Sequence, residues 1–275
     1  MENFDKFYDL KKQDIPDLEG WIGDAKFGFD QIYKYFDNSK RQDVLEIGCG
    51  IGILLNTIKG NFPNLTLEGI EPYKAGFDRL KIAKETFSEK IKINIIKFEN
   101  FKPKKKYDII YSVNVFEHLN NWKQYLEKTR TWLKPEGTNI ILCPNYSFPY
   151  ESHFKIPILF NKKITYFFYK KKINLFEKEK KSLGLWNSLN FVTMRNIKLY
   201  CKNNSMNFKY CNSIFYNIVQ RLDEDREFQK RQNFVGACAK FLKKLGFLKL
   251  FNKKLFYFFH PYMKIEITSR EYKKN

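Results

Sequence analysis

The chain has 275 residues, and its 50 lysines and arginines outnumber its 30 acidic residues, which gives a formal net charge of +20. This length lies between one and two typical domains and is enough to bury a substantial core. The five cysteines are odd in number and form no C-x-x-C pair, which argues against a disulfide framework and against a zinc site. The sequence begins without the basic start and apolar run of a signal peptide, and no uncharged stretch is long enough to span a bilayer. We therefore expect a cytoplasmic protein with reduced thiols and no metal site.

Residues 1–40 contain a helical pattern from about 24 to 36, preceded by two large aromatic side chains, Tyr8 and Trp21. We expect this segment to form a helical lid that closes on a bound ligand. Packing of Trp21 in the core explains the tryptophan equally well.

The stretch from Val44 to Gly52 is an apolar run that ends in an acid and continues into three alternating glycines. This pattern predicts a strand that breaks into a tight loop, because glycine is needed at positive φ or where a ligand presses on the main chain. The third glycine comes one residue too early for a dinucleotide fingerprint. The loop instead resembles the first motif of class I S-adenosylmethionine-dependent methyltransferases, with a structural turn as the alternative. The resemblance implies a cofactor loop made of Glu46, Gly48, Cys49, Gly50 and Gly52.

A second strand is predicted over residues 65–71, ending in Glu71. This acid follows the loop by roughly 20 residues, the distance at which a carboxylate is expected to bind ribose hydroxyls. Pro72 then ends the strand without needing an amide donor. We assign both residues to the cofactor site, with a solvated strand end as the alternative.

A third strand is predicted over residues 91–96, where apolar and polar residues alternate. In the resembled family the loop that follows lines the adenine, often with an aspartate. Lys97 stands at that position here, so the resemblance implies an adenine contact from the backbone amide of Phe98, with Glu99 as a second contact.

The fourth predicted strand covers residues 107–114 and leads into a run that resembles the family pattern S-x-x-V-x-E-H. The resemblance implies that Asn114 and Val115 face the cofactor and that Glu117 and His118 lie near the reacting centre. Alternatively, Glu117 only begins a helix favourably near its positive end, and His118 packs.

Residues 132–137 are typical of a helix end, and a fifth strand is predicted from 138 to 143. Strands and helices alternate from 43 to 144, which predicts a Rossmann-like, doubly wound α/β sheet with ligands at the carboxyl ends of the strands. The resemblance implies seven strands, mostly parallel with an antiparallel last strand, and helices on both faces. We place the cofactor-binding core at 41–157. A C-terminal elaboration at 158–275 would then carry a helical insertion and the last strands, near 208–212 and 263–268.

Residues 144–157 are rich in proline and aromatic side chains and follow neither a helix nor a strand pattern. A long irregular segment at this edge of the sheet is usually functional, although an ordinary surface connection is the alternative. Two of the three histidines lie at the same edge, and a neutral imidazole can remove a proton from a hydroxyl acceptor. An acceptor that is already an anion needs no base. We expect catalysis by His118, His153 and Tyr146, acceptor contacts from Glu117, Asn145 and Glu151, and a structural role for His260.

The positive charge attracts polyanions and phosphorylated metabolites alike. Lysines at 102–106 and at 162–172, the latter around four consecutive aromatic residues, could bind single-stranded nucleic acid or an anionic membrane. A lysine-rich proteome explains them equally well. No RNA-binding module is attached, so nucleic acid is not the expected partner, whereas peripheral membrane contact stays open, as does the choice between monomer and homodimer.

These features together favour an S-adenosylmethionine-dependent methyltransferase that acts on an oxygen of a small anionic acceptor. A sugar, a sugar nucleotide or a phosphorylated precursor would fit. The loop at 145–154 resembles methyltransferases of polysaccharide loci, which implies a role in capsule or other cell-surface polysaccharide biosynthesis. The alternatives are a nucleic-acid or lipid methyltransferase and a non-catalytic protein that only binds the cofactor.

Overall fold

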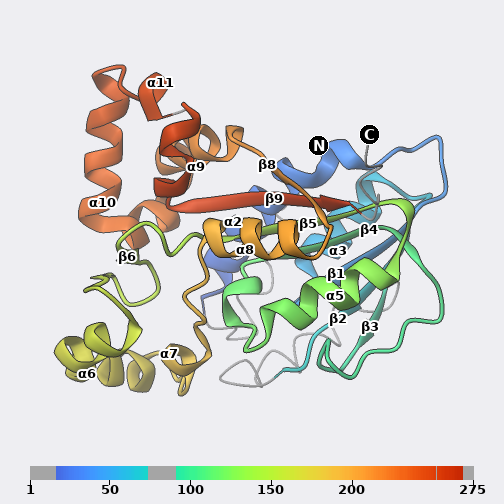
Figure 1. The fold of residues 1–275 in the computed structure, drawn as a ribbon, viewed down its shortest axis with the longest axis horizontal. Coiled ribbons are helices and arrows are strands. Elements are labelled where there is room, and N and C mark those ends of the chain that lie inside the picture. Colours follow the sequence, from blue (N-terminus) through green and yellow to red (C-terminus); the bar gives the residue numbers. More distant parts are fainter. Residues whose placement is uncertain (1–16, 74–90, 252, 269–275) are drawn as a thin grey trace.

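The computed structural model describes residues 17–73, 91–251 and 253–268. A seven-stranded sheet runs through its centre in the order β3-β2-β1-β4-β5-β9-β8 (Figure 1). Strands β1 to β5 are parallel, and β9 pairs antiparallel with both β5 and β8. The fold is therefore the expected Rossmann-like sheet. Its strands are β1 (Asp43–Ile47), β2 (Thr66–Ile70), β3 (Lys92–Asn94), β4 (Tyr107–Val113), β5 (Leu133–Pro144), β8 (Asn207–Tyr210) and β9 (Tyr262–Thr268).

Helices cover both faces of the sheet, and each face has its own hydrophobic core. Adjacent residues of one strand serve opposite cores: Val44 packs toward the first and Leu45 toward the second, as the alternation of a strand requires. The first face is covered by α2 (Leu18–Ile32), α3 (Ile53–Asn61), α9 (Ser213–Glu224) and α10 (Arg226–Lys244). The second face is covered by α5 (Trp122–Trp132) and α8 (Met194–Asn203).

A third, smaller core lies between β5 and α8 in the sequence, where the chain leaves the sheet and returns to it. It is built from the short hairpin strands β6 (Tyr150–Glu151) and β7 (Ile156–Pro157) and the helices α6 (Lys162–Glu179) and α7 (Leu185–Ser188). Figure 1 shows α6 and α7 beyond the same end of the sheet as α10. The third core and α10 therefore lie beside the edge at which the parallel strands end.

The remaining short elements are the 3-10 helices η2 (Tyr33–Tyr35), η4 (Phe116–His118) and η5 (Lys254–Phe259) and the helix α11 (Leu248–Phe251). No helix in the part of the chain that the structure describes has an apolar stretch long enough to cross a membrane.

Three sequence predictions about these elements need correction. Helix α2 begins at Leu18, several residues earlier than expected, and its apolar side packs in the core against α3. Strand β5 begins directly after α5, so residues 133–137, which were expected to end the helix, belong to the strand. A register shift accommodates the extra residues, because Tyr107 and Ile109 of β4 pair with Leu133 and Thr138 of β5. The segment at 144–157 contains the β6–β7 pair, which alternation cannot reveal because each strand has only two residues. Tyr8 lies outside the described residues.

A cluster of charges joins α2 to α9 and α10. Asp24 of α2 accepts hydrogen bonds from Arg221 at 2.7 Å and from Arg231 at 2.9 Å. Arg221 also donates to Asp225 at 2.8 Å, and its guanidinium lies over the rings of Phe27 and Phe228. Burial alone would raise the pKa of Asp24, but the two guanidinium groups hold it below its ordinary value. These contacts fix the helices that border the candidate site.

We predict that Arg221→Met destabilises the protein by about 3 kcal/mol, because removing one partner of a buried ion cluster leaves charges without compensation. Lys243→Met is the matched control. It breaks an exposed contact between α10 and α9, the ion pair of Lys243 with Asp223, and should cost at most about 1 kcal/mol. Urea denaturation of the two variants gives the comparison, and equal losses would contradict the structural role assigned to Arg221.

Candidate functional site

The loop after β1 depends on glycines that contact other parts of the protein. Gly48, Gly50 and Gly52 have φ of +76°, +51° and +84°, a region that side chains with a Cβ rarely adopt. A Cβ on Gly48 would lie 2.3 Å from Val115, and one on Gly50 would lie 2.6 Å from Trp21. Gly52 is the N-cap residue of α3. The loop is therefore held between β4 and α2, and its conformation is closed to any larger residue.

Two carboxylates stand at the carboxyl ends of β1 and β2, Glu46 buried and Glu71 partly buried. Glu46 accepts a hydrogen bond from the Tyr111 hydroxyl at 3.0 Å, and burial raises its pKa to about 8. Glu71 accepts hydrogen bonds from the backbone N–H groups of Gly50 and Tyr73, each at 3.1 Å. Burial raises the pKa of Glu71 as well, although these two hydrogen bonds oppose the shift. Both carboxylates line the same cavity, so they are available to a ligand with positive charge or with hydroxyl donors.

The cavity has a volume of 1610 Å³, more than the roughly 300–1,000 Å³ of an ordinary small-molecule site. It begins at the glycine loop, follows the ends of β2 and β4, and extends to the β6–β7 hairpin, α7 and α10. Its size leaves room for two ligands side by side. The predicted residues that line it are Glu46, Gly48, Cys49, Gly50, Glu71, Pro72, Phe98, Glu99, Asn114, Val115, Glu117, His118 and His153.

The turn after β4 brings the chain back into the cavity. Asn114 adopts a left-handed conformation with φ of +54°, and its side-chain oxygen accepts a hydrogen bond from Tyr262 of β9 at 2.6 Å. Asparagine tolerates this conformation better than most residues with a Cβ. The turn positions Val115 against Gly48 and leads directly into η4, which carries Glu117 and His118.

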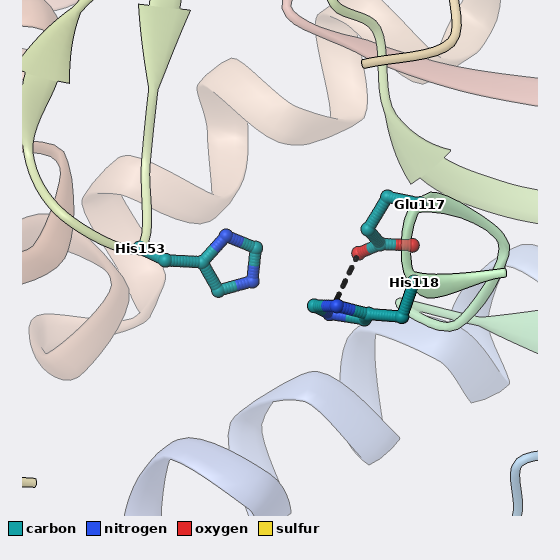
Figure 2. Close-up of side chains that lie close together, drawn as sticks. All are labelled: Glu117, His118 and His153. Carbon is teal, nitrogen blue, oxygen red and sulfur yellow. Dashed lines mark ion pairs between the residues drawn. The ribbon is translucent and has the colours of Figure 1, made fainter. Parts of the chain in front are cut away.

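Glu117, His118 and His153 come together in the lining of the cavity, although His153 lies 35 positions beyond His118 in the sequence (Figure 2). The two imidazole rings have centroids 5.4 Å apart, and Nε2 of His118 lies 3.9 Å from Oε1 of Glu117. Each imidazole is oriented by a contact of its Nδ1 atom. His118 Nδ1 lies 2.9 Å from the Ser188 hydroxyl of α7, and His153 Nδ1 lies 2.6 Å from the Glu151 carboxylate.

Their surroundings give the three groups different proton affinities. Burial raises the pKa of Glu117 to about 7, and the positive charge of a protonated His153 opposes this shift. Burial lowers the pKa of His118 to about 3, so this imidazole is neutral at pH 7. Burial would lower the pKa of His153 too, but the carboxylates of Glu151 and Glu117 outweigh it and raise the pKa. His153 is therefore the stronger base of the pair.

Three predicted acceptor or catalytic residues do not line the cavity, because other parts of the chain engage them. The Asn145 amide donates to the carbonyls of Phe258 and His260 and accepts from the backbone N–H groups of Ser147 and Met194, so it joins β5 to neighbouring segments. The other two are Tyr146, which is buried and stacks on Phe191, and Glu151, whose carboxylate is occupied by His153 and by the Phe154 backbone. Glu151 therefore positions His153 instead of contacting an acceptor.

Gly52 also lies outside the lining, where it begins α3. His260 has the structural role expected of it: its ring nitrogens lie 2.6 Å from the Tyr210 hydroxyl and 2.9 Å from the Phe251 carbonyl, and its ring stacks on Phe215.

Sequence reasoning missed two contributors to the site. Ser188 orients His118 from a short helix that has no sequence signature of its own. The other is an apolar wall supplied by α9 and α10, formed by Phe215, Ile218, Val219, Leu222, Phe228 and Val235. The amphipathic pattern of these helices was visible in the sequence, but their direction toward the cavity was not.

Comparison with known proteins decides the family. A family model described as a methyltransferase domain matches residues 25–191, more than half of the chain. The chain belongs to this methyltransferase domain family. Family membership and the cavity at the glycine loop together identify S-adenosylmethionine as the cofactor, as the first motif predicted.

Individual relatives cover parts of this methyltransferase. The uncharacterized protein Rv1509 of Mycobacterium tuberculosis is 29% identical over 194 residues, which are 69% of this chain and 66% of that protein. A malonyl-acyl carrier protein O-methyltransferase of Ilyobacter polytropus is 33% identical over 103 residues, 37% of this chain and 39% of its own. A ubiquinone biosynthesis O-methyltransferase of Rickettsia canadensis is 25% identical over 161 residues, 53% of this chain and 66% of its own. The chain thus spans about two thirds or less of the length of these curated relatives.

Solved structures agree on the fold. The plantazolicin methyltransferase BpumL in complex with S-adenosylhomocysteine has a TM-score of 0.51 at 15% identity, and the match covers 96% of this chain and 88% of that one. The cyclopropane synthase MmaA2 from Mycobacterium tuberculosis has a TM-score of 0.50 at 13% identity, covering 89% of this chain and 82% of that one.

We predict that Gly48→Ala destabilises the methyltransferase more than Gly246→Ala does. Both glycines have φ of +76°, but no heavy atom lies within 4 Å of a Cβ on Gly246. The control therefore carries only the backbone strain of about 1–2 kcal/mol, whereas the Gly48 variant adds an overpacking cost of about 1–3 kcal/mol against Val115. Urea denaturation measures both, and calorimetry should show weaker cofactor binding only for Gly48→Ala. Equal effects would contradict the steric argument.

We also predict that binding of S-adenosylmethionine releases a proton from Glu46. With a pKa of about 8 this carboxyl is mostly protonated at pH 7, and a cationic ligand favours its ionised form. Affinity should therefore rise between about pH 6 and pH 7.5, by at most about tenfold per unit. Calorimetric titrations in buffers of different ionisation enthalpy measure the released proton. The isosteric Glu46→Gln variant should show neither the release nor the pH dependence.

Proposed function

We propose that this methyltransferase transfers the methyl group to an oxygen of a small anionic acceptor, such as a phosphorylated sugar or a sugar nucleotide used for a cell-surface polysaccharide. The observation that carries the proposal is the cluster of Glu117, His118 and His153, which lines the same cavity as the cofactor loop. A hydroxyl acceptor needs a group that removes its proton, and this cluster provides one.

The chemistry is an in-line displacement. The acceptor oxygen attacks the methyl carbon, the new O–C bond forms as the C–S bond breaks, and the electron pair of that bond remains on sulfur in S-adenosylhomocysteine. The hydroxyl proton passes to a cavity-facing imidazole, for which His153 with Glu151 behind it is the better base. The protein contributes mainly by holding the oxygen close to the methyl group.

Lysines at the outer part of the cavity support an anionic acceptor. Lys155, Lys180, Lys181 and Lys230 line this part, and the chain as a whole carries a charge of +20. Such a field raises the local concentration of phosphorylated molecules. The names of two relatives, both O-methyltransferases, support oxygen as the accepting atom.

A lipid acceptor is the second candidate, and the apolar wall from α9 and α10 favours it. The surface outside this wall carries exposed apolar side chains, among them Phe241, Leu245 and Leu255, with lysines between them. An amphiphile with its hydroxyl near His153 and its chain along α10 would fit this arrangement.

An acceptor panel tests the proposal. The purified chain is incubated with S-adenosylmethionine and sugar phosphates or sugar nucleotides, each paired with the same sugar without phosphate, and also with an isoprenoid phenol and with RNA. We expect kcat/KM to be at least tenfold higher for the phosphorylated member of a pair. Turnover of the isoprenoid phenol alone would favour the second candidate, and turnover of RNA alone would contradict both.

We predict that His118→Ala and His153→Ala each lower the methyl-transfer rate by about 10²- to 10⁴-fold, the range of a lost general base or of the group that positions it. Affinity for S-adenosylhomocysteine should stay nearly unchanged, because neither imidazole belongs to the glycine loop or to the carboxylates at the ends of β1 and β2. Glu71→Ala is the opposite control and should lose cofactor binding. Unchanged rates in both histidine variants would remove this cluster from the chemistry.

A further inference from the structure

The carboxylate of Glu117 is buried without a partner. Its exposed fraction is 0%, and neither of its oxygens has a hydrogen-bond partner among the described residues. A buried carboxylate in this state is costly, because burial removes its hydration and nothing replaces it. The nearest ring nitrogen, Nε2 of His118, is 3.9 Å away, which is too far for a hydrogen bond. A shared proton therefore does not bridge these two groups in this geometry.

The hydrogen bonds behind the two imidazoles determine which nitrogen is free. The Ser188 hydroxyl donates its proton to the Leu185 carbonyl at 2.7 Å, so it accepts from Nδ1 of His118. The Glu151 carboxylate likewise accepts from Nδ1 of His153. Each Nε2 is thereby left to face the cavity, and a neutral imidazole carries a lone pair there.

Three groups that can donate electron pairs thus converge on one point (Figure 2). One ligand atom from each of Glu117, His118 and His153 lies within 4.8 Å of the others. Two ligands of a tetrahedral zinc ion, each about 2.1 Å from it, are about 3.4 Å apart, so side-chain rotations that bring these atoms about 1 Å closer would close the site. The imidazoles also have the outer partners typical of metal ligands, a carboxylate on one and a hydroxyl on the other.

We propose that Glu117, His118 and His153 bind a divalent transition-metal ion at the acceptor end of the cavity. Two imidazoles and one carboxylate suit ions from Mn²⁺ to Zn²⁺, and three protein ligands leave coordination positions open toward the cavity. The expectation of no metal site rested on cysteine spacing. Such spacing cannot predict ligands that η4 and the β6–β7 turn bring together.

The role of the ion rests on the proposed function, although the site itself does not. An acceptor oxygen bound at an open position would be oriented toward the methyl group and made more acidic by the ion. In that state the imidazoles would be ligands and could not accept the proton. The ion would lower the pKa of the bound hydroxyl, which would lose its proton to water. An anionic acceptor would bind the same position without losing a proton.

Cobalt titration tests the site without cofactor or acceptor. The full chain is treated with a chelator, the chelator is removed, and Co²⁺ is added while visible absorption and bound metal are measured. We expect one equivalent to bind with d–d bands of a low-symmetry nitrogen and oxygen site, and Zn²⁺ should displace it. The isosteric Glu117→Gln variant, His118→Ala and His153→Ala should each weaken binding at least 100-fold.

Two further variants make the test specific. Glu151→Gln changes only the partner behind His153 and should weaken cobalt binding about 10- to 100-fold, as loss of an outer partner does elsewhere. Glu71→Gln, which changes the carboxylate after β2, should bind cobalt normally and bind S-adenosylhomocysteine poorly. Glu117→Gln should bind cobalt poorly and bind S-adenosylhomocysteine normally. Binding of S-adenosylhomocysteine also shows that each ligand variant is folded.

The proposal is overturned if the wild-type chain binds no cobalt, or if Glu117→Gln and His118→Ala bind it as tightly as the wild type. Either result leaves the proposed methyl transfer intact, with His153 as the base. Conversely, cobalt binding together with failure of every acceptor would support the metal site and reject the proposed acceptor class.

Discussion

The close packing of the glycine loop between Val115 and Trp21 is the constraint on which the site depends. A Cβ at Gly48 or Gly50 would overlap one of these side chains, so the loop can follow its path only with glycine at both positions. This contact ties the carboxyl end of β1 to the turn after β4 and to α2. It also sets where η4 begins, and therefore where Glu117 and His118 stand relative to the cofactor.

The cavity is lined by carboxylates as well as by basic side chains, although the molecule as a whole carries a large positive charge. Glu46, Glu71 and Glu117 line the cavity, and burial raises the pKa of all three. A buried carboxylate is unfavourable when it is ionised without compensation, and among these three only Glu117 has no hydrogen-bond partner in the described part of the chain. A sulfonium cofactor near Glu46 and a metal ion near Glu117 would each stabilise the ionised form of one carboxylate. The two ligands would then bind to different carboxylates of a single cavity.

The part of the cavity around His118 and His153 is built from segments that lie outside the seven-stranded sheet. The β6–β7 turn brings His153 to His118, and α7 supplies the hydroxyl that orients His118. Helices α9 and α10 supply an apolar wall and are held to α2 by the charge cluster around Asp24. In the proposed function the cofactor loop belongs to the common sheet and these additions would select the acceptor, which is the usual division between a scaffold and its loops.

Local patterns in the sequence determined the fold and the cofactor half of the site. Strand alternation, the glycines of the loop and the acid at the end of β2 act through their immediate neighbours, so their positions could be predicted from the residues themselves. Only the tertiary structure decided the acceptor half. Asn145, Tyr146 and Glu151 were expected to face the acceptor, but distant partners such as Phe258 and Met194 occupy the Asn145 amide, and His153 occupies Glu151. The unpartnered state of Glu117 and its proximity to His153 likewise depend on which segments bury it. Residues far apart in the sequence bury this side chain, so no local sequence pattern predicts its burial.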